Sequence, residues 1–207
     1  TRHTLFRNFI DPYAWHWKNG NTRWDILNVA RFCYAFKKDS SLSWVVGDSS
    51  KPIFKLDRLA PANGIEHSDA HDAMADVIAT IGIAKIIKDT QPKLFKYALS
   101  LSDKNEVKEK IKLFSPMLYT SGIYPAKFSC TKLSTVLAEH PDYSNSAIVF
   151  NLEQDPSLLL ELDTDELKKR LLTKGKNRLQ TQVLAFNKSP MFTYEERRIY
   201  NPQLLDQ

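Results

Sequence analysis

Features that would place this chain in a specialised class of protein are scarce in its sequence. Only two of its 207 residues are cysteines, Cys33 and Cys130, and their contexts are unrelated, so a disulfide framework is not expected. No apolar run approaches the roughly 18 residues that span a bilayer, and the first residues contain no apolar signal-peptide core. The sequence therefore predicts a protein without a membrane segment that resides in the cytoplasm.

Several short motifs of nucleotide-binding proteins and hydrolases are missing too. With only six glycines, the chain contains no Walker A sequence, no Gly-x-Gly-x-x-Gly and no Gly-x-Ser-x-Gly elbow. The two cysteines and His67 lack the spacing of a zinc site. A Ser-His-Asp triad in another setting stays open, because residue counts alone do not exclude it.

What the chain does have is enough apolar sequence for a packed core and a mild excess of positive charge. Hydrophobic residues make up 43% of the chain, and its length fits one or two domains. The net charge of +5 suits a polyanion partner such as nucleic acid, although the same charge would also serve solubility alone.

The stretch from residue 63 to 76 opens what the periodicity predicts to be the longest helix, which continues to about residue 89. Asn-Gly at 63–64 is a turn signal, and Ser68 or Asp69 is the expected N-cap. His71 then falls in or just before the first turn, and Asp76 about one turn further in. Apolar residues three and four apart predict one buried face, made of Val77, Ile78, Ile81, Ala84 and Ile87.

This helix entrance combines a base with a carboxylate. A carboxylate can hold Mg²⁺, which activates a bound water, and an imidazole with a pKa near neutrality can take that water's proton. His71 and Asp76 are therefore candidates for hydrolysis at a phosphate, with Asp76 as the metal ligand. The alternative is structural: His71 caps the helix and Asp76 lies on a solvated face, since motifs this short match by chance.

The adjacent pair His71-Asp72 also suggests an HD-type phosphohydrolase, in which both residues ligate metal. That fold needs a further histidine and a further aspartate from separate helices. The remaining histidines have no supporting context: His3, His16, His67 and His140.

Longer runs resemble a known family. His-Asp-Ala-Met-Ala-Asp-Val at 71–77, preceded by the runs at 55–59 and 62–65, resembles the third motif of the DEDDh 3′→5′ exonucleases. More narrowly, it resembles the exonuclease I family of bacterial enzymes that degrade single-stranded DNA. Phe-Ile-Asp-Pro-Tyr-Ala-Trp at 9–15 and Arg-Trp-Asp-Ile-Leu at 23–27 match the same family, and weaker similarity runs from 158–163 to 187–190. The resemblance covers nearly the whole chain.

The resemblance implies an activity and a division of roles. Such an enzyme hydrolyses single-stranded DNA from its 3′ end to 5′-mononucleotides, acts in DNA repair and recombination, and works as a monomer. His71 would be the general base, and Asp76 one of four acidic ligands to two Mg²⁺ ions. The other three ligands belong to motifs absent from this sequence, so we expect an internal piece of a longer enzyme, inactive by itself. Asp25 aligns with a helix-start aspartate of the family and is expected to be a cap.

The predicted fold class is α/β plus β. By resemblance, residues 1–100 form the C-terminal part of a ribonuclease-H-like exonuclease domain, and residues 101–207 form an SH3-like β-barrel domain. Further helices are expected at 25–37, 55–59 and 93–100, a loop at 39–52 and a charged stretch at 103–112. Strands are expected at 117–123, 133–139, 146–152 and 180–187, with an inserted helix at 164–172 that Thr164 caps.

Aromatic rings and cations alternate over residues 1–24. Bases of a single strand stack on such rings while cations follow the phosphates. The residues proposed to contact DNA are Tyr13, Trp15, Trp17 and Arg23, with Arg31 on the following helix as a phosphate contact. The alternatives are that the rings fill the core and that Arg31, Lys37 and Lys38 lie on a solvated helix edge.

A basic and aromatic cluster lies close to the expected boundary between the domains. Lys37, Lys93, Lys96 and Tyr97 are proposed to dock a partner, which the resemblance implies to be the acidic tail of a single-strand-binding protein. A different class of function also stays open: a non-catalytic module that binds single-stranded DNA or a partner protein.

Overall fold

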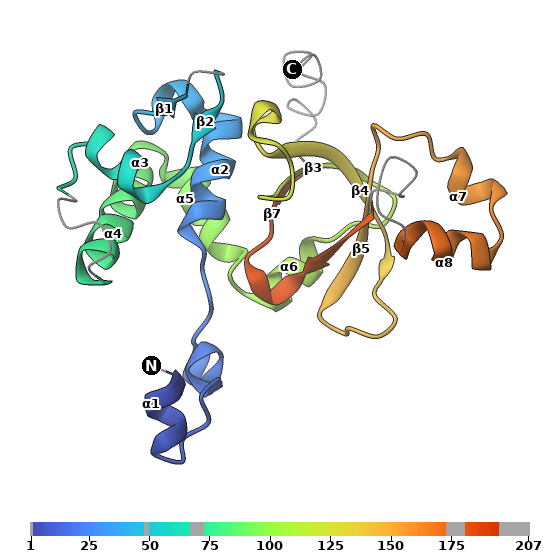
Figure 1. Cartoon of the computed structure of the whole chain (residues 1–207), viewed down its shortest axis with the longest axis horizontal. Helices are drawn as coiled ribbons and strands as arrows, with labels where there is room; N and C mark the ends of the chain where they lie inside the picture. Colours follow the sequence, from blue (N-terminus) through green and yellow to red (C-terminus); the bar gives the residue numbers. More distant parts are fainter. Residues whose placement is uncertain (1, 48–49, 67–72, 173–180, 195–207) are drawn as a thin grey trace.

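The computed structural model describes residues 2–47, 50–66, 73–172 and 181–194, which form two regions that meet between α5 and α6 (Figure 1). The first region is mainly helical. Its elements are α1 (Arg2–Arg7), η1 (Ala14–His16), η2 (Lys18–Gly20), α2 (Ile26–Lys37), η3 (Lys38–Ser40), β1 (Val45–Val46), β2 (Pro52–Ile53), α3 (Leu56–Ala62), α4 (Ala73–Thr90) and α5 (Pro92–Ser100). No helix in these described ranges is long and apolar enough to cross a membrane.

The second region is built around an antiparallel sheet. Its elements are α6 (Lys104–Lys110), β3 (Pro116–Thr120), η4 (Ala126–Phe128), β4 (Thr131–Glu139), β5 (Ser146–Asn151), α7 (Ser157–Glu161), α8 (Thr164–Leu172), β6 (Thr181–Ala185), η5 (Phe186–Lys188) and β7 (Met191–Thr193). The five strands lie in the order β6-β5-β4-β3-β7. Opposed pairs such as Val136 with Val149 and Ala147 with Leu184 are buried and supply its core.

Helix α2 is an element of the first region that packs against the sheet of the second. Its start is fixed by Asp25, whose carboxylate accepts a hydrogen bond from Leu27 N at 3.0 Å, so the predicted cap is confirmed. Of its buried residues, Val29, Ala30, Phe32 and Cys33 lie within one shared core, and Tyr34 packs against the rings of Trp44 and Phe54. Because α2 packs against α4 and α5 as well as β3 and β7, it joins both regions.

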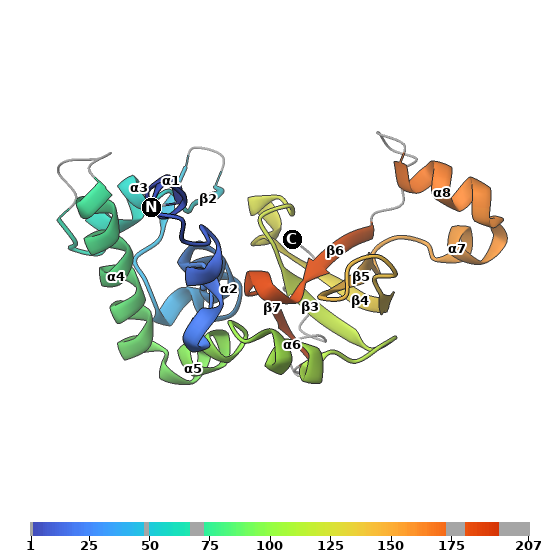
Figure 2. The same ribbon diagram turned by 90° about the horizontal axis from the view of Figure 1, so that it is seen from below.

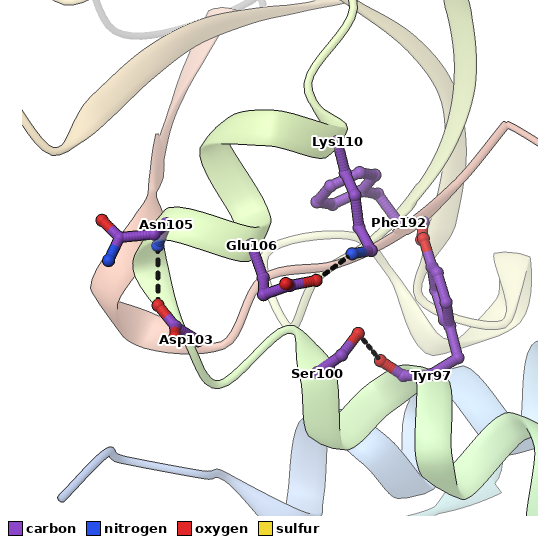
Figure 3. A network of polar contacts seen from close by, with 7 residues as sticks. All are labelled: Tyr97, Ser100, Asp103, Asn105, Glu106, Lys110 and Phe192. Carbon is purple, nitrogen blue, oxygen red and sulfur yellow. Dashed lines mark hydrogen bonds and ion pairs between the residues drawn. The ribbon is translucent and has the colours of Figure 1, made fainter. Parts of the chain in front are cut away.

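A short connection carries the chain from one region to the other, and polar contacts fix its turn (Figure 3). Ser100 Oγ donates to Tyr97 O at 2.8 Å, and Asp103 then caps α6 by accepting from Asn105 N at 2.8 Å. Tyr97 Oη donates to the carbonyl of Phe192, on β7, at 2.8 Å. The connection is therefore ordered, and it places α5 beside the sheet.

Helices α7 and α8 extend away from the sheet in both views (Figure 1, Figure 2). The helix predicted at 164–172 is found, but its cap was predicted wrongly. Asp163, rather than Thr164, accepts from the backbone N–H groups of Asp165 and Glu166 at 3.0 and 2.8 Å. A carboxylate at this place also interacts well with the positive end of the helix dipole.

Other differences concern short elements. The predicted loop at 39–52 contains η3 and β1, which pairs with β2 through Val45 and Ile53. The charged stretch at 103–112 contains α6, and the third helix extends past residue 59 to Ala62. Strand β7 was not predicted at all, and β3 and β6 end earlier than expected, at Thr120 and Ala185. Three-residue strands carry too little periodicity to be found in a sequence.

The largest correction concerns the face of α4. Its buried residues are Ala79, Ile83 and Ile87, so the predicted face is right at Ile87 and partly right at Ala84, which is half-buried. It is wrong at Val77, Ile78 and Ile81. Those three residues, together with Met74, are 49% to 63% exposed. The helix therefore has two apolar faces, and only one of them packs against the other described residues.

Candidate functional site

Of the expected catalytic pair, His71 and Asp76, the structure describes only Asp76. His71 lies outside the described residues, as do Ser68 and Asp69, the expected N-caps. Asp76 lies on α4 with an exposed side chain. Within the described ranges, no group of three or more His, Cys, Asp or Glu residues is placed to hold a metal ion. The roles given to His71 and Asp76 remain predictions.

Residues 2–24, which we call the aromatic segment, form one wall of a hollow of about 590 Å³. We call it the aromatic hollow, and it is lined by residues of both regions, which include Tyr13, His16, Trp17, Arg23, Lys104, Asn145 and Lys188. Tyr13 and Trp17 are 56% and 63% exposed, so neither ring is buried in the core. The hollow therefore combines aromatic rings with cations of both regions, and Asp103 is the one acidic residue in its lining.

Two hydrogen bonds fix the aromatic segment to the second region beside this hollow. Ser189 Oγ donates to Arg23 O at 2.6 Å, and Thr22 Oγ1 donates to Ser102 Oγ at 3.1 Å. Desolvation of its ring, followed by the charges of Arg23 and Arg2, lowers the pKa of His16. The walls are thus set by contacts between regions and carry positive charge.

Two of the residues predicted to contact DNA lie elsewhere. Trp15 does not line the hollow; its Nε1 donates to Pro12 O at 3.0 Å and its ring lies 3.9 Å from that of His16. Arg31 is half-buried on α2 and points to the connection between β3 and β4. The alternative that Arg31 lies on a fully solvated edge is therefore wrong, because its Nε is buried. Lys37 is also half-buried, whereas Lys38 is exposed as that alternative predicts.

A second hollow, of about 830 Å³, contains most of the proposed partner-binding residues. We call it the lysine groove; Lys37, Lys93 and Tyr97 line it from the first region, and Lys110, Lys112 and Tyr194 from the second. Glu109 is the one acidic residue in this lining. Lys96 is exposed on α5 but does not line the groove.

The lysines of this groove differ in how they are compensated. Lys110 is ion-paired with Glu106 on the same helix (Figure 3), so its charge is partly used. Lys112 Nζ lies 5.4 Å from the ring centroid of Tyr194, whose hydroxyl accepts from Lys112 N at 2.9 Å. Burial raises the pKa of Tyr194, and its hydrogen bond to Lys112 partly offsets this. Tyr194 thus holds its phenolic proton more tightly than a free tyrosine does, and it lines a groove rich in lysine.

The structure also reveals a hollow of about 1050 Å³ that the sequence did not suggest. It lies on the second region, and its lining includes Phe128, Lys132, Glu153 and Gln182. Lys132 is ion-paired with Glu153, and its Nζ lies 3.6 Å from the ring centroid of Phe128. No motif joins these residues, because they come from separate strands and turns.

Comparison with known proteins links this architecture to one family. Residues 102–196 match the family described as the exonuclease I SH3-like domain. Exodeoxyribonuclease I of Escherichia coli strain K12 is 45% identical over 175 residues, which are 84% of this chain and 37% of that protein. The chain thus spans well under half the length of the curated relatives it matches.

Solved structures agree with this match. Escherichia coli exonuclease I in complex with a dA16 oligonucleotide superposes with a TM-score of 0.89 at 40% identity, covering 100% of this chain and 45% of that one. A structure of an ExoI/SSB-Ct complex superposes with a TM-score of 0.84 at 37% identity, covering 100% of this chain and 47% of that one. The predicted fold class is confirmed, including the SH3-like second part.

Proposed function

Because the chain belongs to the exonuclease I family, we propose that it forms part of an enzyme that hydrolyses single-stranded DNA from the 3′ end to 5′-mononucleotides. We place this activity in the cytoplasm, in DNA repair and recombination, and carried out by a monomer. In this proposal residues 1–100 belong to the exonuclease domain and residues 101–207 to the SH3-like domain. Exodeoxyribonuclease activity is what the names of the relatives state, and the whole relative is more than twice this length.

The observation that carries the proposal for this chain is the aromatic hollow. A single strand presents flat bases on one side and phosphates on the other, and the hollow presents rings and cations together. Tyr13 and Trp17 supply stacking surfaces worth about 1–3 kcal/mol per base. Arg23 supplies positive charge for the phosphates, and Arg31 a further phosphate contact on the neighbouring helix. Trp15 is proposed as a stacking surface at the edge of the same segment.

The chain's own contribution to a metal site is small. Mg²⁺ prefers oxygen ligands such as carboxylates, and Asp76 is the residue proposed to hold it. The described residues offer no cluster that would hold two ions, so this part of the chain does not by itself fit a complete two-metal site. His71 is proposed to take the proton of the attacking water. Divalent metal would supply charge neutralisation at the phosphate when bound.

A binding titration tests the role of the hollow. A labelled oligo(dT) strand titrated with the chain should bind, and Trp17→Ala should weaken binding about tenfold. The matched control is Phe6→Ala, which removes an exposed ring of the same segment that does not line the hollow. Equal losses for both variants would show a general effect of aromatic content and would remove the hollow from the proposal.

A second function, docking of an acidic peptide, is favoured by the lysine groove. An acidic tail needs cations for its carboxylates and an apolar contact for its aromatic residues. Lys37, Lys93 and Lys112 provide the cations, and Tyr97 and Tyr194 provide the apolar contact. The relative solved as an ExoI/SSB-Ct complex makes the acidic tail of a single-strand-binding protein the proposed ligand. A non-catalytic docking module would need only this groove.

Charge reversal tests the docking proposal. Lys37→Glu should weaken binding of a peptide with acidic and aromatic terminal residues about tenfold or more. The control is Lys85→Glu, which reverses the charge of an exposed residue of α4 outside the groove. Lys96→Glu discriminates between the cluster predicted from sequence and the groove itself, since Lys96 lies outside the lining. Peptide affinity unchanged by Lys37→Glu would exclude the groove as the docking site.

A further inference from the structure

The guanidinium of Arg31 lies where the two regions meet. Its Nη1 donates to Asn28 Oδ1 at 2.9 Å, and its Cζ lies 6.0 Å from the ring centroid of Phe54. Its Nε is buried and has no hydrogen-bond partner in the described structure. A guanidinium carries five N–H donors, so donors remain after the bond to Asn28.

Across the boundary, Gly122 forms the surface against which this guanidinium lies. A Cβ atom built on Gly122 would be 2.7 Å from Arg31 Nη1, 2.9 Å from Cζ and 3.0 Å from Nη2. The three nearest atoms all belong to one flexible side chain, and none is backbone. A methyl group at this position would therefore displace the arginine rather than distort the fold.

The backbone does not explain why residue 122 is glycine. The described glycines with positive φ are Gly20 and Gly64, and Gly122 is not among them. Alanine would be free to adopt its conformation. Space for the Arg31 side chain is therefore the physical requirement at this position.

The same connection holds Arg31 from a second side. Ser121 N donates to Cys130 O at 2.8 Å, which brings Cys130 next to Gly122. Burial raises the pKa of the Cys130 thiol, and the charge and hydrogen bond of Arg31 partly offset this rise. Arg31 is thus confined by its own helix, by Gly122 and by Cys130.

We propose that Gly122 is a positioning residue for Arg31: its missing side chain leaves the space in which the guanidinium is held for a DNA phosphate. This inference rests on the proposed single-strand function. A long arginine side chain that is already confined loses less rotamer entropy when it binds, so confinement strengthens the contact without touching the ligand. Arg31 of the first region would then contact the phosphate, and Gly122 of the second region would fix the position of the Arg31 side chain.

Salt-dependent titration of labelled oligo(dT) tests this coupling. Gly122→Ala should weaken binding about tenfold, as Arg31→Ala does, and each should lower the slope of log K against log salt by about 0.7, the value for one phosphate of a single strand. The double variant should bind no worse than Arg31→Ala. Gly47→Ala is the matched control, because a Cβ there would have its nearest contact at 3.4 Å, with Ile53.

The outcomes separate this inference from the proposed function. Additive losses, or a loss confined to Arg31→Ala, would overturn the role of Gly122 while leaving DNA binding in place. An Arg31→Ala variant that binds like the parent would overturn both the phosphate contact and the role of Gly122. Absence of DNA binding by the parent chain would overturn the proposed function for this chain.

A measurement without DNA keeps the positional claim testable in every case. Gly122→Ala should lower the urea midpoint of unfolding when Arg31 is present and leave it unchanged in an Arg31→Ala background, where the methyl group has room. Equal shifts in the two backgrounds would show that Gly122 does not act through Arg31.

Discussion

The two regions bury their apolar surface differently. In the second region the paired strands enclose Val136, Val149, Leu184 and Phe192, all of them fully or almost fully buried. In the first region α4 buries one face and exposes another, which consists of Met74, Val77, Ile78 and Ile81. The strands of the second region are thus buried within a core that they share with α2, α4 and α5, whereas α4 also carries an apolar face with no cover in the described part of the chain.

The difference separates stability from function. The aromatic hollow and the lysine groove both take their walls from the two regions, and α2 packs against elements of each. Side chains of the shared core should therefore determine stability, while DNA and peptide binding should depend on how the surfaces of the two regions meet. Each prediction below changes one side of this comparison.

The largest expected effect concerns catalysis by the first region. The purified chain should show no Mg²⁺-dependent release of nucleotides from single strands, and an enzyme extended by the upstream part of the family should show it. In that extended enzyme, Asp76→Ala should reduce the rate about 10⁴-fold, the size seen when one member of a catalytic unit is removed. His71→Ala should also reduce it strongly.

A control on the same helix makes this result specific. Asp89→Ala removes an exposed carboxylate near the other end of α4 and should leave the rate unchanged. Rapid hydrolysis by the purified chain, abolished by Asp76→Ala, would mean that a complete site exists within these 207 residues.

The next effect concerns the strands of the second region within the shared core. Phe192→Ala removes a fully buried ring opposite Tyr119 and should lower the free energy of unfolding by about 3–5 kcal/mol. Val183→Ala, on the exposed side of β6, should change it by about 0.5 kcal/mol or less. Urea unfolding followed by circular dichroism measures both. Similar losses for the two variants would mean that the burial of Phe192 does not determine its contribution to stability.

The sequence correctly predicted the long helix at 25–37, its cap and the family of the chain. The helix at 25–37 was found from its apolar spacing and its Asp25 cap, and the chain's match to its family was found from the runs around residues 9–27 and 55–77. Periodicity could not tell which apolar face of α4 would be covered, because both faces repeat every three to four residues. Whether a face is buried depends on what lies next to it.

The residues that form the two proposed binding surfaces were only partly predictable for a related reason. Lys37, Lys93 and Tyr97 were chosen from composition, and the structure places them in one groove. Lys112 and Tyr194 were missed, since no sequence signal brings β7 beside α5. The space between Gly122 and Arg31 likewise depends on contacts between residues 91 positions apart in the chain.

A smaller effect concerns the uncovered face of α4. Ile81→Asp places a charge where water already reaches, so it should leave the unfolding free energy within about 0.5 kcal/mol of the parent. The exposed apolar face should also let copies of the chain associate, and Ile81→Asp should weaken that association about tenfold because less apolar surface is available to bury. Sedimentation velocity over a range of concentrations measures the association. An equally strong association of Ile81→Asp would show that another surface is responsible.

The last expected effect is a loss of stability in alkali that belongs to the second region. Burial raises the pKa of Tyr124 to about 12, and the hydrogen bond to Ser134 partly offsets this. Burial also raises the pKa of Tyr119 and of Tyr194, so the described tyrosines with raised values, Tyr119, Tyr124 and Tyr194, all belong to this region. A folded state that holds its phenolic protons more tightly than the unfolded state is stabilised below the unfolded pKa of about 10.

The sign follows from that difference. Stability from Tyr124 should be complete below pH 10 and should disappear as the pH rises to about 12, a loss on the order of 2 kcal/mol or less. Urea midpoints at pH 8, 10 and 11 should therefore fall more steeply for the parent than for Tyr124→Phe, which has no phenolic proton to lose. Tyr143→Phe, an exposed tyrosine of the same region, is the control and should follow the parent. If Tyr124→Phe lost stability as steeply as the parent, titration of groups other than Tyr124 would set the alkaline limit.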